Sequence, residues 1–177
     1  MGYNKFNKIL RECRARDIPC ITDATREYIL DFLHTHQPIT CIEVGCGVWY
    51  SLLTRADALQ ARWGSIWWYE WSIPNVIEIS IAISWYNNVT ITHADGRYIV
   101  PPKQIHRAFL DGAKAQYVDY LQAILPYMAP WSYIMCDDVI AFRHKLDQLY
   151  SYLQKNQLSY HIVSLSDDDG ICVIKTA

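Results

Sequence analysis

Short apolar runs alternate with amphipathic stretches along the chain, and this alternation constrains the fold more than any other feature. Apolar runs of four to eight residues predict buried strands, and the longer amphipathic stretches predict helices. Strands joined through helices form parallel sheets, because a parallel pair needs a long crossover connection. The 177 residues suffice for one domain with a full core but not for two. We therefore predict an α/β fold with a doubly wound, seven-stranded, mostly parallel sheet.

The elements can be placed from these patterns. Residues 73–88 are ambiguous, and we predict a helix there, because Pro74 suits a first turn and a crossover must precede the next strand. Residues 167–170, Asp-Asp-Asp-Gly, have the composition of a turn closing an antiparallel hairpin. The predicted helices cover about 4–16, 23–36, 51–62, 73–85, 115–127 and 141–156, and the predicted strands cover 40–44, 65–70, 89–93, 106–111, 132–137, 161–166 and 171–175. We assign residues 1–22 to a basic helical extension and residues 23–177 to the domain.

Composition limits where the protein can be located and what it can bind. No apolar run approaches the roughly 20 residues that span a bilayer, and the charged N-terminal segment is unlike a secretory signal, so we predict a cytoplasmic protein without a membrane partner. The six cysteines include no Cys-x-x-Cys pair and are predicted to be reduced, mostly buried thiols. The net charge of −2 does not favour nucleic acid overall. The N-terminal segment is the exception, with Lys5, Lys8, Arg11, Arg14 and Arg16.

A glycine turn follows the first predicted strand. Gly45-x-Gly47 lies between that strand and a helix, where glycine lets the backbone approach a ligand and the helix offers free N–H groups. Glu43 lies inside the strand. Glu70 ends the next strand, and its separation from the glycine turn along the sequence is about that at which an acidic residue binds ribose hydroxyls. A nicotinamide-binding domain would share the ribose acid, but it expects Gly-x-Gly-x-x-Gly and does not explain Glu43.

Three carboxylates follow later strands. Asp111 ends one predicted strand, Asp137 and Asp138 end the next, and Lys114 follows Asp111 by three residues. Because parallel strands point their carboxyl ends into one crevice, these groups should converge. Three converging carboxylates favour an oxygen-ligated cation such as Mg²⁺ or Ca²⁺, and Lys114 could act as a base with a pKa lowered by burial and by the metal. The alternative is that the carboxylates face solvent and cap helices.

At these residues the sequence resembles the class I S-adenosylmethionine-dependent methyltransferases, which have a Rossmann-like sheet. Within them it is similar to the cation-dependent O-methyltransferases of the catechol type, over residues 24–177. The resemblance implies S-adenosylmethionine as cofactor and a divalent cation, Mg²⁺ or another, that lowers the pKa of an acceptor hydroxyl. Lys114 would be the base, and the metal ligands would be Asp111, Asp137 and Asp138. The implied cofactor contacts are Glu43, Gly45, Gly47, Tyr50, Ser51, Glu70, Asp95, Gly96 and Asp111.

The chain departs from this family in two ways. Asp137-Asp138 stands where relatives usually have Asp-Asn, and the segment after it runs almost directly into a predicted helix, which leaves the acceptor site open. We expect a small-molecule hydroxyl acceptor. A tRNA nucleoside hydroxyl, bound through the basic N-terminal segment, is the alternative, and a non-catalytic protein with this fold is a third reading. Relatives are often homodimers, and the apolar, Tyr-rich helices would allow one here.

Tryptophan occurs where relatives commonly have glycine. Trp49 stands in the glycine turn and Trp131 precedes a strand, and the chain has seven Trp and only seven Gly. One hypothesis is that the source organism reads a stop codon as glycine, which the printed sequence renders as Trp. The other is that Trp49 is genuine and folds outward over the loop.

Overall fold

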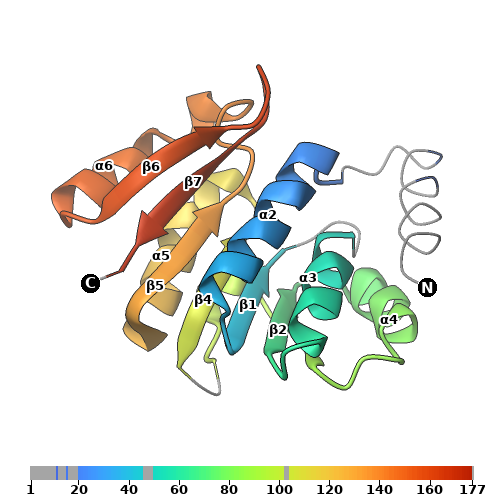
Figure 1. Ribbon diagram of the computed structural model, residues 1–177. Helices are drawn as coiled ribbons and strands as arrows, with labels where there is room; N and C mark the ends of the chain where they lie inside the picture. Colours follow the sequence, from blue (N-terminus) through green and yellow to red (C-terminus); the bar gives the residue numbers. More distant parts are fainter. Residues whose placement is uncertain (1–10, 12–14, 16–19, 46–49, 102–103, 177) are drawn as a thin grey trace.

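The computed structural model describes residues 11, 15, 20–45, 50–101 and 104–176. Its centre is a sheet in the order β3-β2-β1-β4-β5-β7-β6, parallel from β3 to β5 and antiparallel across β5, β7 and β6 (Figure 1). The strands are β1 Thr40–Val44, β2 Ser65–Glu70, β3 Val89–His93, β4 Ile105–Leu110, β5 Met128–Cys136, β6 Ser159–Ser164 and β7 Gly170–Lys175. The helices are α2 Asp23–His36, α3 Tyr50–Gln60, α4 Ile73–Ala82, α5 Tyr117–Ile124 and α6 Asp147–Lys155.

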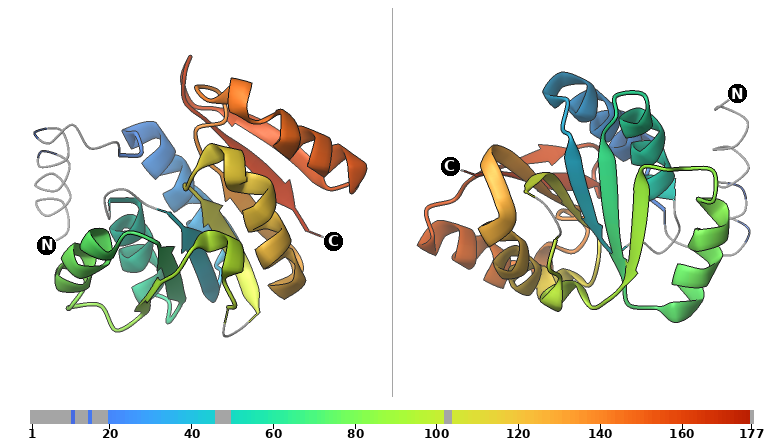
Figure 2. Two further views of the ribbon diagram at one scale, coloured as in Figure 1. Left: turned by 180° about the vertical axis from the view of Figure 1, so that it is seen from behind. Right: turned by 90° about the horizontal axis from the view of Figure 1, so that it is seen from below.

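Two helical layers cover the sheet. Side chains from α2, α3 and α4 pack in one core cluster, and side chains from α5 and α6 pack in the other. Figure 2 draws the helices that carry them from two further sides. Successive strand residues alternate between these layers: Cys41 belongs to the first core and Ile42 to the second. Both faces are therefore buried, which explains why β1 reads as a continuous apolar run interrupted only by Glu43.

The predicted architecture is confirmed, and three strands have the predicted bounds. The stretch 73–88 does contain a helix, α4, with Pro74 in its first turn. The helix packs through Ile79, however, while Ile73, Ile77 and Ile81 are exposed on the opposite face. Pro74 and the need for a crossover thus predicted the helix correctly, but the spacing of these isoleucines does not mark the buried side.

The segment after β5 differs from its prediction. The sequence suggested one helix from Ala141 to Asn156, but α6 begins only at Asp147, after a 3₁₀ turn at Arg143–Lys145. Val139 and Leu146 at the two ends of the intervening segment are buried in the second core. Apolar anchoring, rather than helix periodicity, therefore determines this connection.

Helix α2 is capped and tied to the distant hairpin. The Thr22 hydroxyl accepts the N–H of Thr25, which identifies Thr22 as the N-cap. The hydroxyls of Thr22 and Thr25 also donate to the Asp169 carboxylate, at 2.5 and 2.7 Å. Asp169 belongs to the turn between β6 and β7, so this contact connects the beginning of the domain to its end.

Some predictions fall on other parts of the chain. The basic helix predicted for 4–16 lies almost entirely outside the described residues, as do Gly47 and Trp49. Of the cysteines, Cys41, Cys136 and Cys172 are buried and free, as predicted. None of the helices in the described ranges is both long and apolar enough to cross a bilayer.

Candidate active site

A cavity of about 470 Å³ opens at the carboxyl ends of the parallel strands. Gly45 follows β1, Glu70 ends β2, Asp95 and Gly96 follow β3, and Asp111 follows β4. All five residues line the cavity, and all five were predicted from the sequence as cofactor contacts. Ligands of open α/β sheets bind at this edge, where the strand order reverses beside β1.

The glycines of this cavity are required by close packing. Gly45 has a φ of 72°, and a Cβ there would lie 2.5 Å from the Cα of Gly112. A Cβ on Gly96 would lie 2.2 Å from a methyl group of Val44. Larger residues at either position would push the strand-end loops apart, so the cavity floor depends on glycine.

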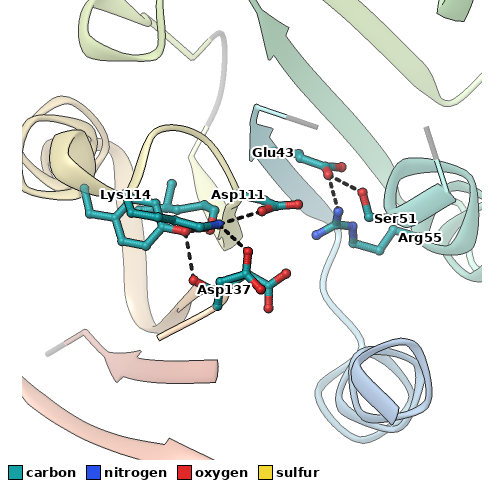
Figure 3. Close-up of polar contacts among 9 residues, drawn as sticks. Glu43, Ser51, Arg55, Asp111, Lys114 and Asp137 are labelled. Carbon is teal, nitrogen blue, oxygen red and sulfur yellow. Dashed lines mark hydrogen bonds and ion pairs between the residues drawn. The ribbon is translucent and has the colours of Figure 1, made fainter. Parts of the chain in front are cut away.

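The three predicted carboxylates do converge. Asp111, Asp137 and Asp138 each offer an oxygen within 4.8 Å of the others (Figure 3). The backbone fixes two of them, because the N–H of Asp111 donates to Val44 and the N–H of Asp137 donates to Leu110. The reading in which these side chains face solvent as helix caps is therefore wrong for Asp137, which is buried.

The electrostatics of this cluster favour a cation. Burial, together with the charges of Asp111 and Asp138, raises the pKa of Asp137 well above its ordinary value. Burial also raises the pKa of Asp111, against the opposing effect of Lys114. Asp137 Oδ1 is buried and has no hydrogen-bond partner among the described residues. A buried carboxylate oxygen of this kind could ligate a cation, and oxygen donors suit Mg²⁺.

Lys114 bridges two of the carboxylates. Its Nζ lies 2.9 Å from Asp111 Oδ1 and 2.9 Å from Asp138 Oδ2. Burial acts to lower the pKa of Lys114, but the two carboxylates outweigh it, and the pKa is raised. The lowered pKa expected from the sequence concerns the site with a bound metal and stays a prediction, whereas the two carboxylates alone outweigh the effect of desolvation.

A second buried charge pair lies beneath the glycine turn. The Glu43 carboxylate accepts the Ser51 hydroxyl at 2.6 Å and pairs with Arg55 Nη2 at 2.5 Å (Figure 3). The Arg55 guanidinium also lies 4.0 Å from the centroid of the Phe109 ring. Glu43, Ser51 and Tyr50 are buried and do not line the described cavity. Glu43 thus joins the end of β1 to the first turn of α3.

Sequence reasoning missed several residues of the site. Arg55 lies four residues after Ser51, so both share one helical face, and this spacing could have indicated it. Arg97 pairs with Asp95 at 2.6 Å at the rim. Gln116 and Tyr120 also line the cavity, and the Tyr120 hydroxyl donates to the Gln116 carboxamide across the same four-residue spacing.

Comparisons with known proteins agree with this architecture. An O-methyltransferase from Bacillus cereus, solved with S-adenosylhomocysteine, has a TM-score of 0.82 at 14% identity, covering 100% of this chain and 92% of the other. The O-methyltransferase TomG from Streptomyces achromogenes, solved with S-adenosylmethionine, has a TM-score of 0.81 at 14% identity, with coverages of 97% and 89%. A methyltransferase from Podospora anserina, bound to S-adenosylhomocysteine, has a TM-score of 0.76 at 15% identity, with coverages of 100% and 97%.

The chain has the class I methyltransferase fold. No family model matches the sequence, and no curated protein matches it either. At identities of 13–15% the structural likeness establishes the methyltransferase fold. The activity of this methyltransferase-fold chain depends on its own side chains.

Proposed function

We propose that the protein is an O-methyltransferase that transfers the methyl group of S-adenosylmethionine to an acceptor hydroxyl. The observation that carries the proposal is one juxtaposition: Asp111 lines the cavity together with Gly45, Glu70, Asp95 and Gly96, and it also belongs to the cluster formed with Asp137, Asp138 and Lys114. Asp111 belongs to both sets, so a cofactor in the cavity would meet the acidic cluster there. The neighbours solved with S-adenosylmethionine or S-adenosylhomocysteine support this reading.

Each end of the cavity has groups suited to one part of the cofactor. The Glu70 carboxylate is buried at the end of β2, where its Oε1 accepts the N–H of Ser72, and an acid at this place suits ribose hydroxyls. Asp95 and Gly96 lie beyond it, where the adenine would bind. Gly45 and the loop after it would hold the methionine end, next to Asp111.

We further propose a divalent cation, Mg²⁺ or a similar ion, held by Asp111, Asp137 and Asp138. When all are ionised, three carboxylates and one ammonium leave two uncompensated negative charges, and a divalent cation balances them. Such a cation supplies Lewis acidity, which lowers the pKa of a bound hydroxyl. The additional carboxylate at Asp138, in place of a neutral amide, increases the negative charge and favours tight binding.

Lys114 is the proposed base. Its ammonium is held by Asp111 and Asp138, and those two charges keep its pKa high. Neutralising them leaves burial as the main influence on Lys114, which lowers the pKa and frees the amine to accept the hydroxyl proton. Orientation of the acceptor oxygen toward the methyl group would then supply much of the remaining rate gain.

Calorimetric titration of S-adenosylmethionine tests the cofactor part of the proposal. We expect a Kd on the order of micromolar, or about −8 kcal/mol, and loss of binding in Glu70→Ala. Glu27→Ala, which changes an exposed glutamate on α2, is the matched control and should bind normally. The titration is run on the chain with Trp49 and on Trp49→Gly. Absence of binding in both forms refutes the proposed function and supports a non-catalytic protein.

A second titration tests the metal. Mg²⁺ binding should disappear in Asp137→Asn and persist in Asp167→Asn, an exposed site in the hairpin turn. Binding should weaken as the pH falls, because protons compete for carboxylates whose pKa is raised. Equal Mg²⁺ affinity in both variants would remove the metal from the mechanism.

The acceptor remains part of the proposal. A small phenolic or enolic hydroxyl fits an oxygen-ligated cation at the rim, and a panel of catechol-like diols tests it. A tRNA nucleoside hydroxyl is the second candidate, through the basic N-terminal segment, and it requires salt-sensitive RNA binding. A homodimer and a cytoplasmic location remain proposals as well.

A further inference from the structure

Two tryptophans have a backbone conformation that favours glycine. Trp63 and Trp131 both have a φ of 60°, in the left-handed region. A bulky residue there is a rare outlier, because its Cβ crowds the following carbonyl. Both side chains are also exposed, at 95% and 70%, although tryptophan is usually highly buried. Among the described glycines, only Gly45 has a positive φ. The other described residues with a positive φ are Gln37, Asp138 and Gln157, whose side chains are smaller than that of tryptophan.

Trp63 occupies the position after a helix end at which glycine is most common. The N–H of Gly64 donates to the carbonyl of Leu59, and the N–H of Trp63 donates to that of Gln60. These two bonds define a Schellman motif that terminates α3, with Trp63 at its left-handed C′ residue. Glycine is strongly enriched at this residue, because it has no Cβ to strain. The backbone here is built for glycine.

Trp131 lies inside β5, beside an irregularity in the sheet. Pro130 precedes it, and the register between β4 and β5 shifts between Ile105 and Arg107. A residue with positive φ directly after a proline is a position that favours glycine or asparagine. The Trp131 side chain is 70% exposed and its ring lies 5.1 Å from Lys175 Nζ, so burial offers no reason for tryptophan here.

We propose that the natural residue at positions 63 and 131 is glycine, encoded by a stop codon that the source organism decodes as glycine. The printed sequence gives Trp at both positions because such a codon has been rendered as tryptophan. The same reading accounts for the composition, in which glycine is as scarce as tryptophan. Any of the seven Trp positions can be affected, depending on the codon at each.

The same glycine assignment at position 49 would affect the proposed cofactor site, and this extension rests on the proposed function. Residue 49 lies outside the described residues, so only the sequence bears on it. With glycine there, the loop reads Glu-Val-Gly-Cys-Gly-Val-Gly-Tyr-Ser. Glycine in a strand-to-helix loop lets the backbone approach a ligand closely, so a third glycine would favour the proposed cofactor binding.

Peptide mass spectrometry of the protein from its source organism is the direct test. Tryptic cleavage gives peptides 27–55 and 115–143, in which Trp49 and Trp131 are the only tryptophans, and peptide 63–97, which begins at Trp63. We expect peptide 115–143 to be lighter by one Trp-to-Gly difference, and fragment ions to place glycine at 63. Unshifted masses at both positions overturn the inference. These masses do not depend on methyl transfer, so they remain informative if the proposed function fails.

Variants of the chain as printed test the backbone argument. Trp63→Gly and Trp131→Gly should each raise the ratio of folded to unfolded protein roughly five- to thirty-fold, by relieving left-handed strain. Trp85→Gly is the matched control, since Trp85 is 79% exposed but has no positive φ, and it should give no such gain. Equal or lower stability of the first two variants, relative to the control, overturns the backbone argument.

Cofactor titration separates the two proposals. Shifted masses with S-adenosylmethionine binding restored by Trp49→Gly support both. Shifted masses without binding in any form uphold the glycine assignment and refute the proposed function.

Discussion

Replacing Arg55 with methionine should destabilise the protein severely. Arg55 and Glu43 form an ion pair at 2.5 Å with side chains only 4% and 0% exposed. Methionine keeps an unbranched apolar side chain but removes the charge and the guanidinium that lies over the Phe109 ring. The Glu43 carboxylate then remains buried, keeps its Ser51 hydrogen bond and loses the charge of Arg55.

The size of the effect follows from this burial. Removing one partner of a buried ion pair typically costs about 3–5 kcal/mol, because the remaining charge is desolvated without compensation. For a domain of this size each kcal/mol lowers the Tm by about 2–4 °C, so the expected loss is roughly 6–20 °C. Adding Glu43→Gln to Arg55→Met should recover much of this loss, because no charge then remains buried.

Urea unfolding followed by circular dichroism measures all three variants. Arg97→Met is the matched control: it breaks a comparably short ion pair, with Asp95, whose side chains are 38% and 34% exposed. We expect no measurable change there, because solvent screens the pair. A loss below about 1 kcal/mol in Arg55→Met, or no recovery in the double variant, would show that water reaches Glu43.

Three further predictions concern the same edge of the sheet and the core behind it. Gly96→Ala should cost about 1–3 kcal/mol in chemical denaturation and weaken cofactor binding, because its Cβ would lie 2.2 Å from a Val44 methyl group. Tyr117→Phe should cost about 1–3 kcal/mol and weaken Mg²⁺ binding in calorimetry, since its buried hydroxyl lies 3.0 Å from the carbonyl of Asp137, which would lose this donor. Burial raises the pKa of Cys41 and of Cys172 to about 12. Both thiols should therefore resist alkylation at pH 8 in the native state. Stability should fall as the pH rises from 9 toward 12, because only the unfolded thiols ionise there, and a constant urea midpoint over that range would contradict this.

The sequence predicted the parallel part of the fold well, because its signals there are local. Strands 40–44, 65–70 and 89–93 are apolar runs between clear turn residues, and their bounds are confirmed. The start of α6 could not be predicted, since Val139 and Leu146 decide it through contacts with distant core residues. The exposed isoleucines of α4 show a related limit: tertiary packing, rather than their spacing, decides which face is buried.

The candidate site was predictable to the extent that topology places strand ends together. Asp111, Asp137 and Asp138 come from two strands, and the rule for parallel sheets was enough to bring them together. The pKa of Lys114 was not predictable, since its direction depends on two ion pairs at 2.9 Å rather than on burial alone. Arg55 was missed because a charged residue inside a predicted helix is normally expected to be exposed to solvent.

The position of β7 has a consequence for how the chain is made. β7 lies between β5 and β6 in the sheet, although it follows both of them in the chain. Among the described strands, β6 has β7 as its one neighbour. Until residues 170–175 have left the ribosome, β5 therefore presents an open apolar edge and β6 cannot dock. Before β7 is available, the exposed edge of β5 is a surface that chaperones and proteases recognise. A polypeptide truncated before residue 170 keeps this exposed edge and should therefore be degraded.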